Sequence, residues 1–159
     1  MGGHTWGSTL ANLNLNLPGG YTLGCEYFAD VMAGTYPTRM AMQVDNNTAN
    51  ERAGMRYNGV AAGTRSVSVT GGTLTTVDSY AINEGTLVKQ ALAVGSRAHL
   101  SAANGSLGSG SFGLAVPAGM TNLRLGSDSG SNQLIGGLVR AWIVPAAAYG
   151  GKPLTDYSR

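Results

Sequence analysis

Hydrophobic residues alternate with polar residues along most of the chain, and a period of two is typical of strands with one buried face. The clearest example is the set Tyr21, Leu23, Cys25 and Tyr27, which would share one face while the residues between them take the other. The same alternation occurs at 13–17, 40–44, 53–57, 67–69, 74–82, 112–116, 123–125 and 138–144. These segments predict a series of short strands.

Turn-forming residues separate the predicted strands. Asn-Gly at 58–59 and 104–105 and Gly-Gly at 71–72 are typical of hairpin turns. Only at 87–100 does the pattern also allow a helix, because several apolar residues there would share one helical face. Gly95 interrupts that run, so we expect two strands there.

About ten short strands at spacings of 8–12 residues, with no helices between them, predict an all-β domain of antiparallel sheets, either a sandwich or a barrel. The chain has 159 residues, enough for one domain with a hydrophobic core. No linker-like segment divides it. The residues that follow Pro145 are expected to form an extended arm with one helical turn.

Composition excludes several classes of protein. Charged residues make up only 11% of the chain, whereas an average soluble protein has roughly 25%. The net charge is +2 and the basic residues form no run, so we expect no nucleic-acid partner. No apolar stretch is long enough to cross a membrane. Cys25 is the only cysteine, which excludes an internal disulfide and a cysteine-based zinc site.

The residues that catalysis would need are not grouped in the sequence. A glycoside hydrolase needs two carboxylates flanking the scissile bond, and no two acidic residues stand at i and i+2. Glu26 and Asp30 would share a strand face but lie about 13 Å apart. His99 is expected at a hydrogen-bonded or exposed strand position, and no G-x-S-x-G elbow accompanies it. The G-x-G-x-x-G match at 108–113 precedes no helix, so it predicts a loop. We expect no enzymatic activity.

The order of the motifs resembles a known family. The segments concerned are GYTL with EYF at 20–28, MQVDNNT at 42–48, GMTNLRLGSD at 119–128 and the closing strand at 134–145. Together they resemble the concanavalin A-like (laminin G-like) jelly-roll domains of virion proteins in tailed bacteriophages. The resemblance implies an antiparallel two-sheet jelly-roll sandwich over 18–145, with an N-terminal arm and first strand at 1–17 and a C-terminal arm at 146–159.

Sugar binding on such a fold would need an exposed aromatic ring beside amides and carboxylates. The candidate ligand-binding residues are Trp6, Tyr36, Asp45, Asn46, Asn47, Asp128 and Asn132. Trp142 lies in an apolar strand and is expected in the core. No cofactor is expected, although the oxygen-rich loops at 45–47 and 128–132 keep calcium as an alternative.

The resemblance implies a structural role on the exterior of a virion, as a capsid decoration, a head fibre or part of a tail fibre. The low charge also favours assembly as a homo-oligomer with other virion proteins as partners. The first residues lack the pattern of a secretory signal, so we expect synthesis in the host cytoplasm. The alternative is a carbohydrate-binding adhesin that recognises glycans of the host surface.

Overall fold

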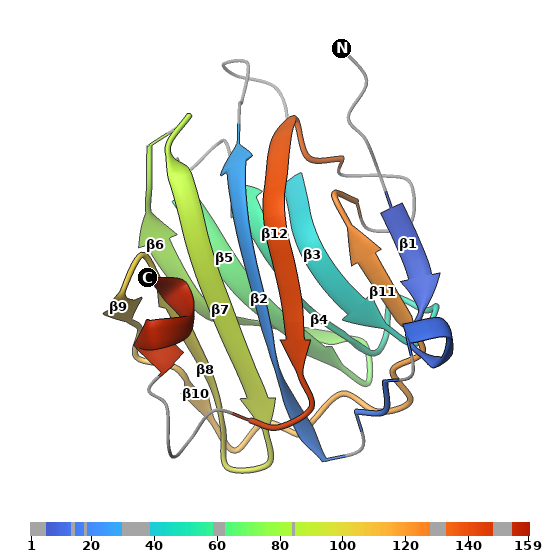
Figure 1. Cartoon of the computed structure of the whole chain (residues 1–159). Coiled ribbons are helices and arrows are strands. Elements are labelled where there is room, and N and C mark those ends of the chain that lie inside the picture. The colour runs from blue at the N-terminus through green and yellow to red at the C-terminus, as the bar shows by residue number, and fades with distance from the viewer. Residues whose placement is uncertain are drawn as a thin grey trace.

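The protein folds as two antiparallel β-sheets packed face to face (Figure 1). The computed structural model describes residues 6–13, 15–17, 19–29, 39–58, 63–83, 85–127, 133–147 and 154–159. The fold is the concanavalin A-like jelly-roll sandwich, so the predicted fold class is confirmed. None of the helices within these ranges is long and apolar enough to cross a membrane.

Sheet A has six strands in the order β1-β11-β3-β4-β5-β6. The strands are β1 (Trp6–Thr9), β3 (Arg39–Asp45), β4 (Arg52–Asn58), β5 (Gly63–Thr70), β6 (Thr73–Ala81) and β11 (Asn122–Leu125). The neighbours β3 to β6 form successive hairpins, and the turn between β5 and β6 is the predicted Gly71-Gly72 pair, in which both glycines have positive φ.

Sheet B has the strand order β10-β8-β7-β2-β12, and the short β9 pairs with β8. The strands are β2 (Gly20–Ala29), β7 (Leu87–Gly95), β8 (Ala98–Ala103), β9 (Ser106–Leu107), β10 (Ser111–Phe112) and β12 (Gly136–Val144). The segment 87–100 therefore forms strands, as predicted. The G-x-G-x-x-G match contributes β10 and loops and precedes no helix.

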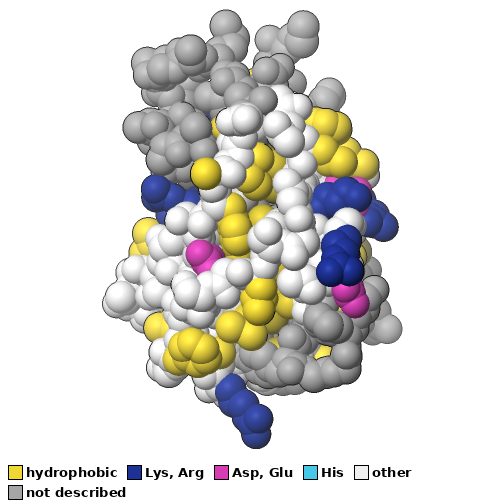
Figure 2. All heavy atoms as spheres, turned by 90° about the vertical axis from the view of Figure 1, so that its left-hand side faces the viewer, with side chains coloured by type: hydrophobic (Ala, Val, Ile, Leu, Met, Phe, Trp, Pro, Cys, Tyr) yellow, Lys and Arg dark blue, Asp and Glu magenta, His cyan; other side chains and the backbone are white. Residues whose placement is uncertain are grey.

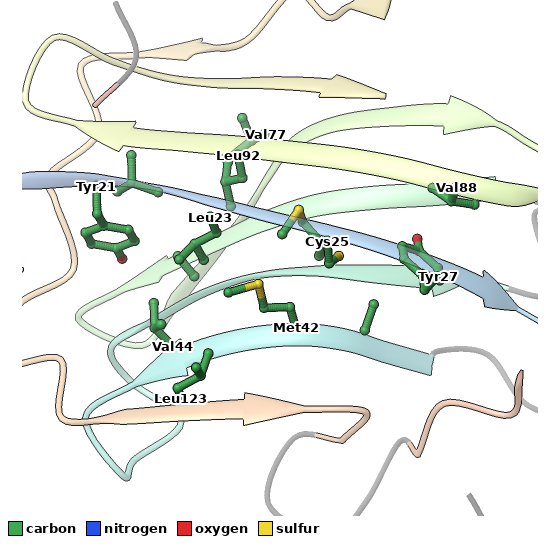
Figure 3. Packing of buried hydrophobic residues seen from close by; sticks show 14 of the residues in the cluster. Tyr21, Leu23, Cys25, Tyr27, Met42, Val44, Val77, Val88, Leu92 and Leu123 are labelled. Carbon is green, nitrogen blue, oxygen red and sulfur yellow. The ribbon is translucent and has the colours of Figure 1, made fainter. Parts of the chain in front are cut away.

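The hydrophobic core lies between the inner faces of the two sheets (Figure 3). Tyr21, Leu23, Cys25 and Tyr27 of β2 are each 0% exposed, and they point toward residues of sheet A such as Met42. This confirms the alternation predicted for 21–27. Burial raises the pKa of the Cys25 thiol well above its ordinary range, so the thiol stays protonated.

Beside this apolar region, the interior contains a hydrogen-bonded polar network. Tyr27 Oη and Thr64 Oγ1 share a hydrogen bond of 2.5 Å, and Gln90 Nε2 donates to Ser66 Oγ at 2.9 Å. Ser66 Oγ in turn lies 2.5 Å from Ser101 Oγ. Because buried polar groups destabilise a fold unless they are paired, this network restricts how the two sheets can slide past each other.

His99 is fully buried in β8, and neither ring nitrogen has a hydrogen-bond partner among the described residues. The expectation of a hydrogen-bonded or exposed histidine was therefore wrong. The cause is its register, because His99 and Ser101 share the inner face of β8. Burial lowers the pKa of His99 below its ordinary value, so the ring is neutral in the folded protein.

The outer face of sheet B carries Trp142, which was predicted to lie in the core. Trp142 pairs with Gly24, whose neighbours Leu23 and Cys25 point inward, so the indole lies on the other side of the sheet. The ring rests against Gly24, where a Cβ atom would come within 2.1 Å of it. The Arg140 guanidinium lies 5.1 Å from the ring centroid. The strand is apolar, but its register turns the indole outward.

The C-terminal segment also packs on the outer face of sheet B. The 3₁₀-helix η2 (Leu154–Ser158) places Leu154 against a small apolar cluster that includes Ala91, Ala93 and Ala102. The expected helical turn is therefore present, and it contacts β7 and β8.

The predicted strand at 13–17 does not form. Residues Ala11–Leu13 make the 3₁₀-helix η1, and residues 15–17 have no regular structure. Leu17 is nevertheless buried, whereas Leu13 is 38% exposed. The Leu10 carbonyl accepts hydrogen bonds from the amides of Leu13 and Leu15, so the chain turns here and the leucines no longer share one face.

Figure 2 shows the side of the sandwich that contains β6 and β9. Basic side chains lie mainly at the margins of this view, and polar and backbone atoms cover much of the rest. A stripe of hydrophobic side chains runs between them. This side of the molecule is thus poor in charge, in keeping with the low charged fraction of the chain.

We expect Gly24→Ala to destabilise the fold by about 1–3 kcal/mol, because its Cβ must displace the Trp142 ring. Gly137→Ala in β12 is the matched control, since a Cβ there meets nothing within 4 Å. Urea denaturation of both variants measures the difference. Equal midpoints for the two variants would contradict the packing described for Trp142.

Candidate functional site

The outer face of sheet A carries a row of polar and charged side chains that a ligand could reach. Met55 and Tyr57 point into the core, so Arg52, Gly54 and Arg56 lie on the other side of β4. The outward residues of the neighbouring strands follow from the register of each pair. They are Gly7, Thr9, Asn122, Arg124, Gln43, Asp45, Arg65, Val67 and Val69.

A shallow groove of about 380 Å³ crosses this face at β1 and β11. We name it the β1–β11 groove. It is lined by Gly7, Ser8, Thr9, Asn12, Asn122, Leu123 and Arg124. Hydroxyl, amide and guanidinium groups therefore dominate its lining. Gly7 has no side chain, which leaves the backbone of the edge strand open beside Arg124.

The floor of the groove is organised by an ion pair between Arg124 and Asp45. Arg124 Nε donates to Asp45 Oδ2 at 2.6 Å, and Nη2 donates to Asp45 Oδ1 at 3.3 Å and to Asn47 Oδ1 at 2.9 Å. Gln43 Nε2 adds a hydrogen bond of 2.7 Å to Asp45 Oδ2. Asn122 Nδ2 lies 3.3 Å from Asp45 Oδ1. The Arg124 side chain is 20% exposed, so it remains open to the groove.

This arrangement changes the acidity of Asp45. Burial alone opposes ionisation of the carboxyl, but the hydrogen bonds from Arg124, Gln43 and the Asn47 amide outweigh it and lower the pKa below its ordinary value. Asp45 is therefore ionised in the folded protein and holds Arg124 in a fixed orientation.

Arginines continue across the middle of the same face. Arg56 of β4 stands directly opposite Arg65 of β5, and Arg52 stands opposite Val69. Ion pairs join Arg124 to Asp45, Arg140 to Glu26 and Arg159 to Asp156. Arg52 and Arg65 take part in none of them. The outer face of sheet A therefore carries Arg52, Arg56 and Arg65 in addition to the Arg124–Asp45 pair.

The predicted site residues do not come together in one place. Asp45, Asn46 and Asn47 lie at the end of β3, next to the groove. Trp6 is 49% exposed, but it pairs with the inward-facing Leu125 and so lies on the other side of sheet A. It lines an apolar hollow of about 330 Å³ together with Leu125, Gly126, Leu134, Gly136, Gly137 and Leu138.

Three predicted residues, Tyr36, Asp128 and Asn132, lie outside the described residues. Within the described ranges, no three His, Cys, Asp or Glu side chains gather as a metal site. Asp45, which the sequence offered as a calcium ligand, uses both carboxylate oxygens in hydrogen bonds to Arg124. Glu26 is ion-paired with Arg140 on the outer face of sheet B, and Asp30 lies outside the described residues.

Sequence reasoning missed Arg124, Asn122, Thr9 and Asn12 as site residues. Asn122 and Arg124 stand in the motif used for the family resemblance, where they alternate with Leu123 and Leu125. That alternation could have placed them on an outer face. It could not have shown that β11 lies between β1 and β3, which brings them beside Thr9 and Asp45.

Comparison with solved structures identifies the architecture. The first is the carbohydrate-binding module CBM40 of the Ruminococcus gnavus IT-sialidase bound to alpha2,6 sialyllactose, at a TM-score of 0.69 and 16% identity over 94% of this chain and 87% of that one. The second is domain 4 of AbnA, an extracellular arabinanase from Geobacillus stearothermophilus in complex with arabinotriose. It gives a TM-score of 0.71 and 14% identity over 91% of this chain and 69% of that one.

Mouse laminin alpha1 domains LG4-5 give a TM-score of 0.62 at 9% identity, over 84% of this chain and 37% of that one. No family model and no curated protein sequence matches the chain. At these identities the likeness establishes the fold, which is the concanavalin A-like and laminin G-like jelly roll implied by the sequence motifs. None of these three structures is described as a virion protein.

We expect Asp45→Asn to destabilise the protein at neutral pH by about 1.5–3 kcal/mol, because a charge-assisted pair with Arg124 is lost. The lowered pKa adds a pH dependence. In the wild type, the contribution of Asp45 is complete above its unfolded pKa of about 3.9 and is lost as the pH falls through the lower folded value.

Thermal melts of both proteins between pH 7 and pH 2 measure this. Asp45→Asn should lack the part of the acid transition that belongs to Asp45. Asp156→Asn is the control, because its pair with Arg159 is 3.5 Å long and exposed. An acid transition that is unchanged in Asp45→Asn would show that the pair does not stabilise the fold.

Proposed function

We propose that the protein is a carbohydrate-binding module that holds a glycan in the β1–β11 groove. The observation that carries the proposal is the lining of that groove, where Thr9, Asn12, Asn122 and Arg124 present hydroxyl, amide and guanidinium groups along an open, shallow surface. Sugars expose hydroxyls that donate and accept hydrogen bonds, so this combination suits them.

The groove is preorganised for such contacts. Asp45 fixes the Arg124 guanidinium through two hydrogen bonds, and Arg124 in turn contacts Asn47. A side chain that is already ordered loses less conformational entropy when a ligand binds. Asp45 and Asn47, which the sequence proposed as ligand contacts, here support the groove from below, and Arg124 presents the hydrogen-bond donors.

The comparisons support the same function. Two structures that share the fold over more than nine-tenths of this chain are bound to oligosaccharides, sialyllactose in one and arabinotriose in the other. The first is named as a carbohydrate-binding module, which agrees with the expectation that this protein binds without catalysing a reaction.

Isothermal titration against ligands chosen from a glycan array tests the proposal. We expect Asn12→Ala and Asn122→Ala to weaken binding about 2–12-fold each, the loss of one hydrogen bond. Asn12 is exposed and its side chain has no partner among the described residues, so its replacement should leave the fold intact. Asn83→Ala, an exposed position beyond β6 at the far edge of sheet A, is the matched control.

Binding to no glycan on the array would refute the function, and equal binding by all three variants would refute the location of the site.

A second proposal concerns where the module works. We propose that it is displayed on the exterior of a phage virion as a homo-oligomer, which the motif resemblance supports. A structural feature also favours self-association. Among the described residues β12 is an edge strand of nine residues that pairs with β2, and Val139, at the register shift between Leu138 and Arg140, is 57% exposed. Long apolar edge strands pair readily with another chain.

Light scattering after size exclusion measures the mass of the purified protein. We expect an oligomer for the wild type and a shift toward monomer for Val139→Lys, because a lysine on an edge strand opposes pairing. Leu74→Lys, at an exposed apolar position on the β6 edge of the other sheet, is the control. A wild-type monomer at micromolar concentration would count against both the oligomer and the virion role.

A further inference from the structure

We propose that the protein has a second sugar-binding site, a small hollow on the outer face of sheet B that takes one or two neutral sugar residues. This inference goes beyond the proposed function, because the hollow lies on the opposite sheet from the β1–β11 groove and shares no lining residue with it. Its volume is about 260 Å³, and we name it the β12–η2 hollow. It is lined by Arg140, Ala141, Trp142, Asp156, Tyr157 and Arg159.

The position of η2 leaves room for the hollow. Ala91 and Ala102 give η2 a surface of small side chains on β7 and β8, and Leu154 is buried against it. The far end of η2 is tied to the turn after β8, because Ser158 Oγ accepts a hydrogen bond of 3.1 Å from the Gly105 amide. The helix therefore covers β7 and β8, and the hollow lies between it and β12.

Trp142 forms the wall of the hollow on β12. Its row across the sheet runs from Trp142 to Gly24 and Ala91, so small residues lie beside the indole. The ring rests against Gly24 but stays partly exposed on the side of the hollow. Tyr157 adds a second aromatic ring from η2. Such rings offer a large apolar surface with a polar tip, which suits the C–H groups of a sugar ring.

Arg140 is held in a fixed orientation, as Arg124 is on the other sheet. Its Nη2 donates a hydrogen bond to Glu26 Oε1, and its guanidinium lies over the Trp142 ring. The Glu26 side chain is 10% exposed, whereas that of Arg140 is 61% exposed. A guanidinium carries five N–H donors. Arg140, anchored to Glu26 through one nitrogen, therefore still presents donors to a ligand.

The other charged groups of the hollow come from η2. Asp156 Oδ1 lies 3.5 Å from Arg159 Nη1, and the two side chains are 33% and 70% exposed. An exposed pair of this length contributes little to stability, so both groups can turn toward a ligand at small cost. Sugar hydroxyls both donate and accept hydrogen bonds. A carboxylate that accepts and guanidinium groups that donate therefore suit neighbouring hydroxyls of one ring.

The charges of the hollow favour a neutral ligand. Each arginine that lines it has an acidic partner, Glu26 for Arg140 and Asp156 for Arg159. An anionic sugar would approach both carboxylates, whereas a neutral sugar meets no such repulsion. The volume limits the size of the ligand. Pockets for drug-sized ligands begin at about 300 Å³, so this smaller hollow suits one or two sugar residues.

A groove on one sheet and a hollow on the other make the module bivalent. The two sheets of a sandwich are about 10 Å apart, and each site lies on an outer face, so one short oligosaccharide cannot fill both. The module would instead join two glycan chains. On a surface that presents many copies of a glycan, the second contact forms at a high effective concentration and strengthens the attachment.

The two tryptophans allow the hollow to be observed by itself. Trp6 and Trp142 are the only tryptophans of the chain, so the indole fluorescence of Trp6→Phe comes from Trp142 alone. Trp6 is 49% exposed, and its replacement should leave the fold intact. The neutral probes are maltose, lactose, cellobiose and mannobiose. We expect at least one of them to change the Trp142 fluorescence saturably, and digalacturonic acid to bind at least about fivefold more weakly than the best of them.

Arg159→Gln and Asp156→Asn, made in the Trp6→Phe background, test the contacts. We expect each to weaken the best neutral probe about tenfold, because a charge-assisted hydrogen bond to the sugar is lost. Thermal melts should show little change, since the ion pair between the two residues is exposed. Arg97→Gln, at an exposed position in the turn between β7 and β8, is the matched control and should bind as Trp6→Phe does.

The outcomes separate the hollow from the groove. If none of the four neutral probes changes the Trp142 signal, the second site is wrong, and array binding that depends on Asn12 still supports the groove. Equal binding by Arg159→Gln and Arg97→Gln, or a Trp142 response that disappears in Asn12→Ala, would also overturn the second site. Digalacturonic acid that binds more tightly than every neutral probe would overturn the neutral class. A response that depends on Arg159 without any effect of Asn12→Ala on array binding would support the hollow and refute the groove.

Discussion

The packing of β2 against sheet A is the contact on which the rest of the structure depends. Tyr21, Leu23, Cys25 and Tyr27 are wholly buried between the sheets, and sheet B is hydrogen-bonded around this strand, between β7 and β12. Once one face of every strand is committed to the core, the opposite face is fixed as well. The side chains that reach the surface are therefore set by which face of each strand packs into the core. If β4 shifted its pairing by one residue, Arg56 would turn inward and Tyr57 would turn outward.

That constraint explains what the sequence could and could not predict. Alternation located the main strands and turns and, with the motifs, the fold. The prediction from alternation failed at 13–17, where hydrogen bonds to the Leu10 carbonyl turn the chain and no strand forms. It also failed at Trp142, which was expected in the core because its strand is apolar, although its pairing with Gly24 places it on the outer face. The candidate site was harder to predict, because Thr9, Asn122 and Asp45 come together only through the strand order β1-β11-β3. The local alternation of hydrophobic residues contains no information about strand order.

Electrostatics then divides the outer face of sheet A into two parts. At β11 and β3, an acid and an arginine satisfy each other and provide a rigid edge to a polar groove. At β4 and β5, two arginines, Arg56 and Arg65, stand directly opposite each other. A jelly roll tolerates this asymmetry because its stability comes from the core and the interior hydrogen bonds around Gln90, and leaves the surface free to vary.

The buried thiol of Cys25 has a practical consequence. Its pKa is raised and none of its surface reaches solvent, so alkylating reagents, oxidants and soft metals find no thiolate to attack. Since the chain has no other cysteine, a new one introduced on an outer face would be the sole reactive sulfur. A fluorophore, a spin label or a surface linkage could then be attached at one chosen point, with the native residue left in place.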